Sequence, residues 1–212
     1  MAEIDHIVIG ARTLEEGAAY VTALLGATPR AGGTHAGAGT HNLLLGLGPD
    51  AYLEVIARDP DQPEPPHPRL FDLDDPATRT MLDAEPRLLA WVARTTAMDA
   101  LMARLGPRGG LVREMRRGTL AWRFAVPPPR QDMNHLIPPM IEWRGEPAAS
   151  QLPDSGLRLI ALEAEHPDVD ALRRELSERG LAEALPARRG PHPRLIAHLR
   201  GKDAAPITMT SA

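Results

Sequence analysis

Apolar and polar positions along the chain follow one pattern that occurs three times. Each copy opens with a short apolar run typical of a β-strand, at 4–10, 88–94 and 157–163. After each run, apolar residues recur every three or four positions, as on one face of a helix, until a glycine ends the stripe. Alternating or continuous apolar runs typical of strands then follow. The pattern predicts three copies of a unit in which one helix separates the first strand from further strands.

Two of the predicted helices have clear local signals. Thr13 and Glu16 form the capping-box pattern that opens a helix. In the second copy, Leu101 lies on the apolar stripe of the helix together with Met98 and Leu105. We therefore expect Leu101 to be buried.

The three copies divide the chain into modules. We assign the first module to 1–58, a proline-rich linker to 59–86, the second module to 87–145 and a shorter third module to 156–212. Prolines are gathered mainly between the periodic segments, where they favour turns and surface connections. The predicted fold class is α+β, rich in strands and with few helices.

Composition narrows the function classes. The 212 residues are 43% hydrophobic, which is enough to bury a core, and their net charge is −4 with scattered basic residues, so no nucleic-acid partner is expected. Because the chain has no cysteine, disulfides and thiolate chemistry are excluded, and any metal must be held by histidines and carboxylates. No apolar run is as long as a membrane span and no secretory signal is recognised, which predicts a cytoplasmic protein without a membrane partner.

Two of the strand-like runs each carry one residue that can bind a metal or move a proton. Side chains alternate between the faces of a strand, so His6 points the same way as Val8, and Glu54 points the same way as Ile56. A glutamate between apolar neighbours is costly to bury without a partner, so Glu54 is exposed at an edge, paired with a cation or directed into a polar cavity. For His6, the alternative to a site is a hydrogen-bonded core histidine. A buried imidazole beside a buried carboxylate would be a site.

These runs resemble the glyoxalase-like, or vicinal oxygen chelate, superfamily. The resemblance is carried by Asp5-His6-Ile7-Val8-Ile9, Tyr52-Leu53-Glu54-Val55-Ile56, the hairpin over 43–54, the run at 88–94 and Pro139-Met140-Ile141-Glu142-Trp143. It implies one glyoxalase-like domain over 1–212, made of repeated βαβββ modules that form curved mixed β-sheets with helices on the outer faces. Such modules carry one metal ligand on the first strand and another on the last, and His6 and Glu54 stand at those positions.

The same resemblance gives Glu142 the matching position in the second copy. It implies that Glu142 lines the cavity of His6 and Glu54 and acts as a ligand or as the catalytic base. One imidazole and two carboxylates are compatible with zinc, manganese or iron when water or substrate fills the other positions. The partner position on the first strand of this copy falls near Leu89, which cannot bind a metal. The usual ligand set is incomplete, so a site without a metal is the alternative.

Further polar and aromatic residues are candidates for the walls of this cavity. His41 and Asn42 follow each other on a predicted strand and are candidates for substrate binding, although an edge-strand histidine in water is the alternative for His41. Trp91 and Trp143 are candidates for an aromatic wall that would bind substrate, and core positions are the alternative for both.

Two other histidines are left out of the predicted site. His35 falls in a glycine-rich segment over 32–39, where we expect a solvated loop histidine, with a mobile lid residue as the alternative. His135 precedes Pro138 and Pro139 on an expected loop. Both are therefore expected outside the cavity.

The resemblance implies two functions. The first is a small-molecule enzyme or enzyme relative with lyase, isomerase or dioxygenase chemistry on an oxygen-bearing metabolite, and the incomplete ligand set leaves both a metal-dependent and a metal-free version open. The alternative is a metal-free protein that binds or sequesters a small molecule. Two modules usually enclose the cavity, so a third must pack outside them or complete its sheet against another chain. We therefore expect a homodimer.

Overall fold

The described part of the chain repeats one order of elements three times. The structure is a computed structural model that describes residues 2–128 and 132–211. The first unit comprises β1 (Glu3–Gly10), α1 (Leu14–Leu25), β2 (Arg30–His35), β3 (Thr40–Gly46) and β4 (Tyr52–Arg58). The second comprises β5 (Arg87–Arg94), α3 (Met98–Leu105), β6 (Leu111–Arg117), β7 (Leu120–Val126) and β8 (Met140–Trp143). The third comprises β9 (Arg158–His166), α4 (Val169–Glu178), β10 (Ala187–Arg189), β11 (Arg194–Arg200) and β12 (Pro206–Thr210).

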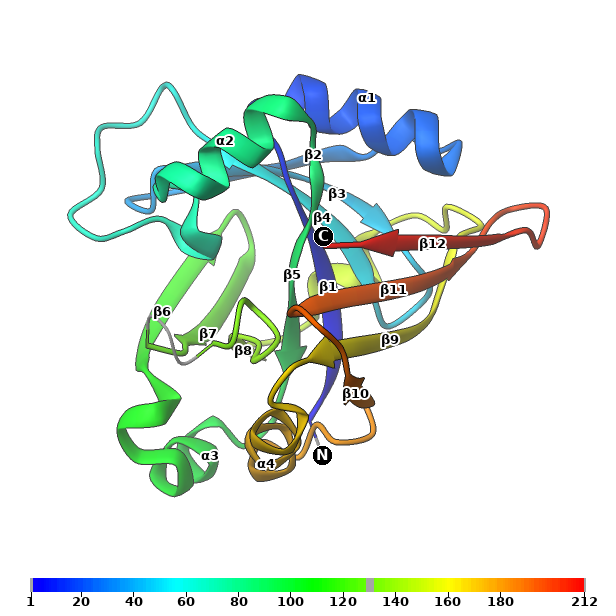
Figure 1. Ribbon diagram of the computed structural model, residues 1–212. Coiled ribbons are helices and arrows are strands. Elements are labelled where there is room, and N and C mark those ends of the chain that lie inside the picture. Colours follow the sequence, from blue (N-terminus) through cyan, green and yellow to red (C-terminus); the bar gives the residue numbers. More distant parts are fainter. Residues whose placement is uncertain (1, 129–131, 212) are drawn as a thin grey trace.

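The strands of the first two units form one mixed sheet. Its order is β2-β3-β4-β1-β5-β8-β7-β6, in which β1 runs parallel to β4 and antiparallel to β5. The sheet curls so strongly that its two edge strands, β2 and β6, contact each other (Figure 1). The α+β class and the curved mixed sheets predicted from the sequence are therefore confirmed.

Alternation along β1 and β4 separates two cores. On one face of the curved sheet, Ile7 and Leu53 belong to a large core that includes residues of α3, α4 and the second sheet. On the other face, Val8 and Ile56 pack inside the curl with aromatic residues such as Trp122. Because His6 and Glu54 have the same parity as Val8 and Ile56, the fold directs them into the curl.

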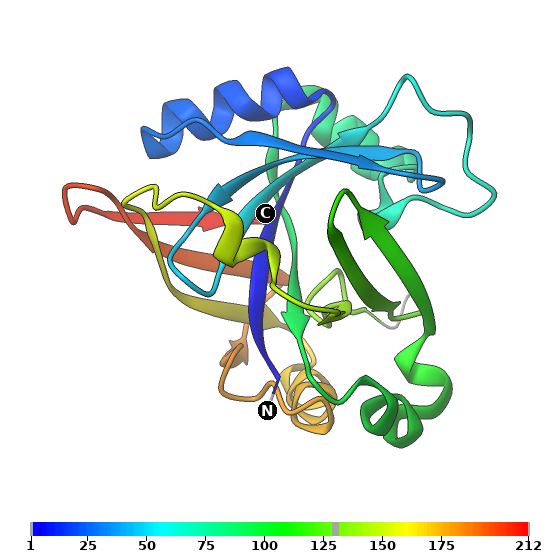
Figure 2. The same cartoon turned by 180° about the vertical axis from the view of Figure 1, so that it is seen from behind.

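The third unit packs on the outside of the curved sheet within the same chain. Its four strands form a separate sheet in the order β10-β9-β11-β12, on the opposite side of β1 and β5 from the β6–β7 hairpin (Figures 1 and 2). Leu162 and Leu195 share a core with Ile7, and the Leu159 N–H donates a hydrogen bond to the Leu47 carbonyl at 3.0 Å. This is the first of the two arrangements expected for a third module. The homodimer and the division into modules stay predictions.

Local signals set the ends of α1. The Thr13 hydroxyl accepts a hydrogen bond from the Glu16 N–H at 3.2 Å, as the capping-box pattern predicts. The helix ends at Gly26, which adopts a left-handed conformation with φ of 64° that glycine tolerates without a steric penalty. Within the helix, Gly17 lies so close to β4 that an added Cβ would stand 2.3 Å from the Val55 side chain. Glycine at this position therefore lets the helix and the sheet pack closely.

The proline-rich linker contains a helix that the sequence pattern did not reveal. Pro76–Ala84 form α2, which begins with Asp75 accepting hydrogen bonds from two backbone N–H groups and has Pro76 at its first position. Just before it, Leu70–Asp72 form a short turn. Leu82 of α2 is buried against the core inside the curl, so the linker closes one end of it. None of the helices in the described ranges is long and apolar enough to span a bilayer.

Candidate active site

His6 and Glu54 converge inside the curled sheet. They come from the adjacent parallel strands β1 and β4, where His6 pairs with Tyr52 and Val8 pairs with Glu54. The His6 Nε2 lies 3.5 Å from the Glu54 Oε2, and both side chains are buried. The structure thus brings together the two residues predicted as metal ligands. Metal binding by the pair stays a prediction.

Asp5 orients the His6 ring. The Nδ1 of His6 lies 2.6 Å from the Asp5 Oδ1, and the ring stacks on Tyr52 with centroids 4.4 Å apart. Burial alone would lower the pKa of His6, but the hydrogen bonds and negative charges of Asp5 and Glu54 raise it to about 9. At neutral pH the imidazole of the unliganded protein therefore carries a proton on each nitrogen.

Glu54 is held as a carboxylate by its neighbours. Its Oε1 accepts a hydrogen bond from the Asn42 Nδ2 at 2.5 Å. Burial alone would raise the pKa of Glu54, but the hydrogen bond and charge of His6, together with His35 and Asn42, lower it to about 2. His6 and Glu54 therefore form a buried ion pair.

His35 belongs to this cluster, and the expectation of a solvated loop histidine was wrong. It is the last residue of β2 and is buried, with its Nδ1 2.9 Å from the Thr40 Oγ1 and its Nε2 3.8 Å from the Glu54 Oε1. Its Nε2 also lies 3.2 Å from the Asn42 amide nitrogen, which donates to it. Burial is the main cause that lowers the pKa of His35, so this ring is neutral while His6 is charged.

The glycines before His35 form a strand that makes room for polar side chains. An added Cβ on Gly32 would stand 2.2 Å from the Asn42 Oδ1, and one on Gly33 would stand 3.0 Å from the Arg117 Cδ. This space lets Arg117 of β6 reach across the closed edge of the sheet and donate a hydrogen bond to the Asn42 Oδ1 at 2.8 Å. The glycine-rich segment therefore leaves the space in which Asn42 and Arg117 contact each other beside Glu54.

Aromatic side chains from the second unit line the other side of the cavity. Trp122 and Trp143 contact each other with centroids 5.4 Å apart, and the Trp143 Nε1 donates a hydrogen bond to the Asp5 Oδ2 at 2.8 Å. The remaining space beside His6 and Glu54 is about 30 Å³. Asn42 and Trp143 thus lie in this cavity, as the sequence led us to expect. Their roles in substrate binding stay predictions.

Glu142 does not line this cavity, and that expectation was wrong. Its carboxylate accepts hydrogen bonds from the Met98 N–H at 3.0 Å and from the Arg123 Nη1 at 3.1 Å. On β8, Ile141 and Trp143 point toward His6, so alternation turns the residue between them to the opposite face. The matching position in the second copy was off by one residue.

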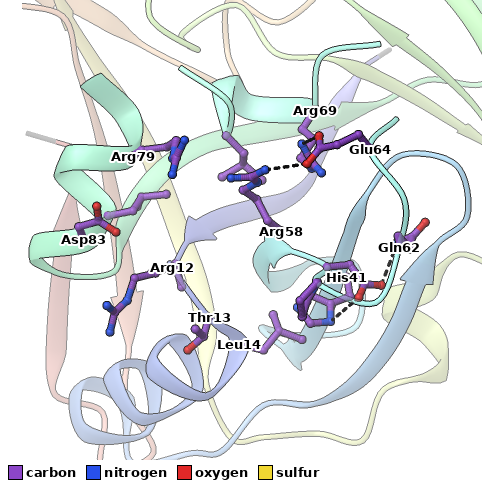
Figure 3. Close-up of a pocket in the computed structure, with 15 residues that line it drawn as sticks. Arg12, Thr13, Leu14, His41, Arg58, Gln62, Glu64, Arg69, Arg79 and Asp83 are labelled. Atoms are coloured by element: carbon purple, nitrogen blue, oxygen red, sulfur yellow. Dashed lines mark hydrogen bonds and ion pairs between the residues drawn. The ribbon is translucent and has the colours of Figure 1, made fainter. Parts of the chain in front are cut away.

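His41 also points away from the cavity, because its neighbour Asn42 points into it. Its Nδ1 lies 3.8 Å from the Asp59 Oδ1, in a different pocket of about 500 Å³ (Figure 3). That pocket lies between α1, α2 and the segment after β4, and the charged side chains of Arg58 and Arg69 in it are paired with Glu64. The assignment of His41 to the cavity of His6 was therefore wrong.

Trp91 is a core residue, which was the alternative to an aromatic wall. Its side chain is fully buried in the outer core, and its Nε1 donates a hydrogen bond to the Leu136 carbonyl at 3.2 Å. Trp91 on β5 has the same parity as Ala93, which lies in that core as well. Its assignment to substrate binding was wrong.

A second group of metal-ligating residues lies outside the cavity. The His135 Nε2 is 3.4 Å from the Asp72 Oδ2, and its Nδ1 is 2.8 Å from the Asp132 Oδ2. One atom from each of these three side chains lies within 4.8 Å of the others. Burial alone would lower the pKa of His135, but Asp132 and Asp72 raise it, so the three residues satisfy one another as an ion-paired group. No local sequence signal links Asp72 with the other two, which are sixty residues away.

The chain is similar to several known proteins. The family model described as a glyoxalase-like domain matches residues 4–180. A crystal structure of a hypothetical protein from Staphylococcus aureus has a TM-score of 0.62 at 12% identity and covers 98% of this chain and 85% of that chain. Methylmalonyl-CoA epimerase from Streptomyces coelicolor, in complex with 2-nitronate-propionyl-CoA, has a TM-score of 0.46 at 19% identity, covering 68% of this chain and 98% of that chain. A methylmalonyl-CoA epimerase in complex with methylmalonyl-CoA and NH4+ has a TM-score of 0.47 at 20% identity, covering 72% of this chain and 99% of that chain. The search of curated proteins gave no match.

Proposed function

The chain belongs to the glyoxalase-like domain family of the vicinal oxygen chelate superfamily, and on this premise we propose that it is a metal-dependent enzyme acting on a small oxygen-bearing metabolite at His6 and Glu54. The observation that carries the proposal is the approach of the His6 Nε2 to the Glu54 Oε2 at 3.5 Å in a buried cavity with aromatic walls. Lyase, isomerase and dioxygenase chemistry all fall within the proposal, because a fold does not choose among reactions. We further propose a cytoplasmic homodimer whose partner is its small-molecule substrate.

The residues present fit a divalent metal ion such as zinc, manganese or iron. The Asp5 carboxylate is hydrogen-bonded to the Nδ1 of His6, and the other ring nitrogen, Nε2, is directed at Glu54. Metal-binding histidines are commonly held in this way by a carboxylate. The Nε2 of His35 lies 3.8 Å from the same carboxylate but already accepts a hydrogen bond from the Asn42 amide, so the proposed ligands are His6 and Glu54. A metal held here would act as a Lewis acid toward vicinal oxygens of the substrate.

The protein groups around the pair support chemistry on an oxygen-bearing molecule. The Asn42 amide and the Arg117 guanidinium place hydrogen-bond donors beside Glu54, where they would stabilise negative charge that develops on a substrate oxygen. Trp122 and Trp143 exclude water from one side of the cavity. Exclusion of water strengthens the electrostatic interactions of the charged groups inside.

One observation favours a metal-free binding protein as the second candidate. His6 and Glu54 already satisfy each other as an ion pair, and Glu142 adds no carboxylate to this cavity. In this alternative the pair and Asn42 would hold the polar end of a ligand without any chemical step. Both candidates use the same cavity, and they differ in whether a metal binds.

Metal analysis of protein purified without a histidine tag separates the two candidates. We expect about one zinc, manganese or iron ion per chain after reconstitution, and a loss of that ion in His6→Ala and in Glu54→Gln. Glu142→Gln is the matched control, because it alters a partly buried carboxylate on the opposite face and should keep the ion. Wild-type protein that takes up none of the three metals would contradict the enzyme proposal and favour the binding protein.

A further inference from the structure

The space beside His6 and Glu54 is too small for a substrate. Its volume of about 30 Å³ corresponds to roughly one water molecule. Pockets for small molecules usually have on the order of 300–1,000 Å³. A ligand that reaches the pair must therefore extend into a neighbouring cavity.

A larger cavity adjoins this space across a thin partition. It has a volume of about 340 Å³ and shares two lining residues, Leu70 and Phe71, with the space beside His6 and Glu54. Its walls are mainly apolar and include Val126, Ile137 and Pro139, whereas Asp72 and His135 lie among its polar lining residues. The segment Leu70–Asp72 therefore has the small reactive space on one side and an apolar chamber on the other.

Two other pockets are less suited to the same ligand. The pocket of about 500 Å³ near His41 shares no lining residue with the space beside Glu54, among the residues that the structure describes. The cleft of about 800 Å³ beyond Trp143 shares only that residue with it, and its other lining side chains are mostly charged or polar, such as Arg123 and Glu142. Of these three cavities, the apolar chamber shares the most lining residues with the space beside His6 and Glu54.

The partition is held in an unusual backbone conformation. Phe71 has φ of 57° and ψ of 34°, in the left-handed region that a bulky aromatic residue rarely adopts, and Asp72 follows with φ of 53°. Two contacts keep the turn in place: His135 from another segment approaches Asp72 at 3.4 Å, and Asp74, just after the turn, accepts a hydrogen bond at 2.9 Å from the N–H of Arg69, just before it. Such conformations persist only where surrounding contacts impose them, and they cluster at ligand clamps and switches.

We infer that the two spaces are one binding site in two chambers, which takes an amphipathic small molecule with an oxygen-bearing head and an apolar body, a ring or a short branched chain. The head lies at His6 and Glu54, and this part rests on the proposed function. The apolar body lies in the chamber between Leu70–Asp72, Val126 and Ile137. Phe71 forms the partition between them and limits the size of the body that the site accepts.

Fluorescence titration with anilinonaphthalene sulfonate, a probe with apolar rings and an anionic oxygen-bearing head, tests the chamber in metal-free protein. Val126→Trp fills the chamber from its partly exposed rim and should weaken binding by about fivefold or more, because the apolar rings lose buried surface. Phe71→Ala removes the partition and should strengthen binding by about threefold or more. Ile160→Ser is the control, since it removes an exposed apolar side chain far from the chamber and should leave binding unchanged.

The outcomes separate this inference from the proposed function. If Val126→Trp and Phe71→Ala both bind the probe like the wild type, while circular dichroism shows all variants folded, the chamber is not the ligand site. That result would leave metal binding by His6 and Glu54 untouched. Conversely, the wild type could take up no zinc, manganese or iron while the variants bind the probe as expected. That result would retain the two-chamber site and reject the metal-dependent reaction.

Discussion

Trp143 and Asp5 join the second unit of the fold to the first at the reactive pair. The Trp143 Nε1 donates a hydrogen bond to the Asp5 Oδ2 at 2.8 Å, while the other carboxylate oxygen of Asp5 lies 2.6 Å from the His6 Nδ1. A residue 138 positions away along the chain thus fixes the carboxylate that orients the imidazole. The geometry of His6 depends on both units.

Trp143→Phe should therefore destabilise the fold. The change leaves the buried Asp5 carboxylate without one donor, and we expect the free energy of unfolding to fall by about 1–3 kcal/mol. Urea denaturation followed by circular dichroism measures it. Trp122→Phe is the control, because the Trp122 indole makes no hydrogen bond within the described residues. This variant should lose less free energy of unfolding than Trp143→Phe.

The buried ion pair predicts a pH dependence of stability. His6 has a pKa raised to about 9, so its contribution is fully present below its ordinary pKa of 6.5 and is lost as pH rises toward 9. Glu54 has a pKa lowered to about 2, so its contribution is present above its ordinary pKa of 4.5 and is lost as pH falls toward 2. We expect the contribution of the pair to be largest from about pH 4.5 to about pH 6.5.

Glu54→Gln provides the check on this pH dependence. Without the negative charge of Glu54, the pKa of His6 rises less, and the loss of stability above neutral pH becomes shallower than in the wild type. Urea denaturation over a series of pH values measures both slopes. Equal alkaline slopes in the two proteins would show that His6 and Glu54 do not titrate as a coupled pair.

Leu101 tests the apolar stripe of α3. The side chain is buried, as the periodicity predicted, and its replacement by alanine should lower the free energy of unfolding by about 2–5 kcal/mol. Leu24→Ala on α1 is the matched control, because Leu24 is an exposed helical leucine and should cost within about 0.5 kcal/mol. Similar losses in both variants would argue against a packed α3 face.

Gly32→Ala tests the space that β2 leaves for the polar cluster. The added Cβ would stand 2.2 Å from the Asn42 Oδ1, so Asn42 must leave Glu54 or Arg117. We expect a loss of stability of about 1–3 kcal/mol and weaker metal binding in the same variant. Unchanged metal affinity, measured by calorimetry, would show that Asn42 does not contribute to the site.

The alternation of side chains between the two faces of a strand predicted that His6 and Glu54 face the site, because this rule needs only the local sequence. It placed His6 with Val8 and Glu54 with Ile56, and the fold then directed both residues inward. The same rule excludes a shared cavity for His41 and Asn42, because adjacent strand residues face opposite sides. By the same rule only one of the neighbours Glu142 and Trp143 can face the cavity, and the register of β8 decides which one.

The remaining site residues depend on contacts that the sequence pattern does not encode. The glycine-rich segment before His35 has the composition of a loop, yet it forms β2 because its lack of side chains accommodates Asn42 and Arg117. The turn at Leu70–Asp72 and the helix α2 lie in a proline-rich segment that favoured a linker. Their positions are set by the core inside the curl, which only the closed sheet creates.

Proton release on metal binding, measured by titration calorimetry in buffers of different ionisation enthalpy, tests the central claim most directly. The pKa of His6 is about 9, so a metal that binds its Nε2 at neutral pH must displace that proton, and we predict about one proton released per ion. His135→Ala should behave like the wild type, because its group with Asp72 and Asp132 lies outside the cavity. His6→Ala should lose both the binding and the release. Binding and proton release that persist in His6→Ala and disappear in His135→Ala would contradict the account and move the metal to the other group.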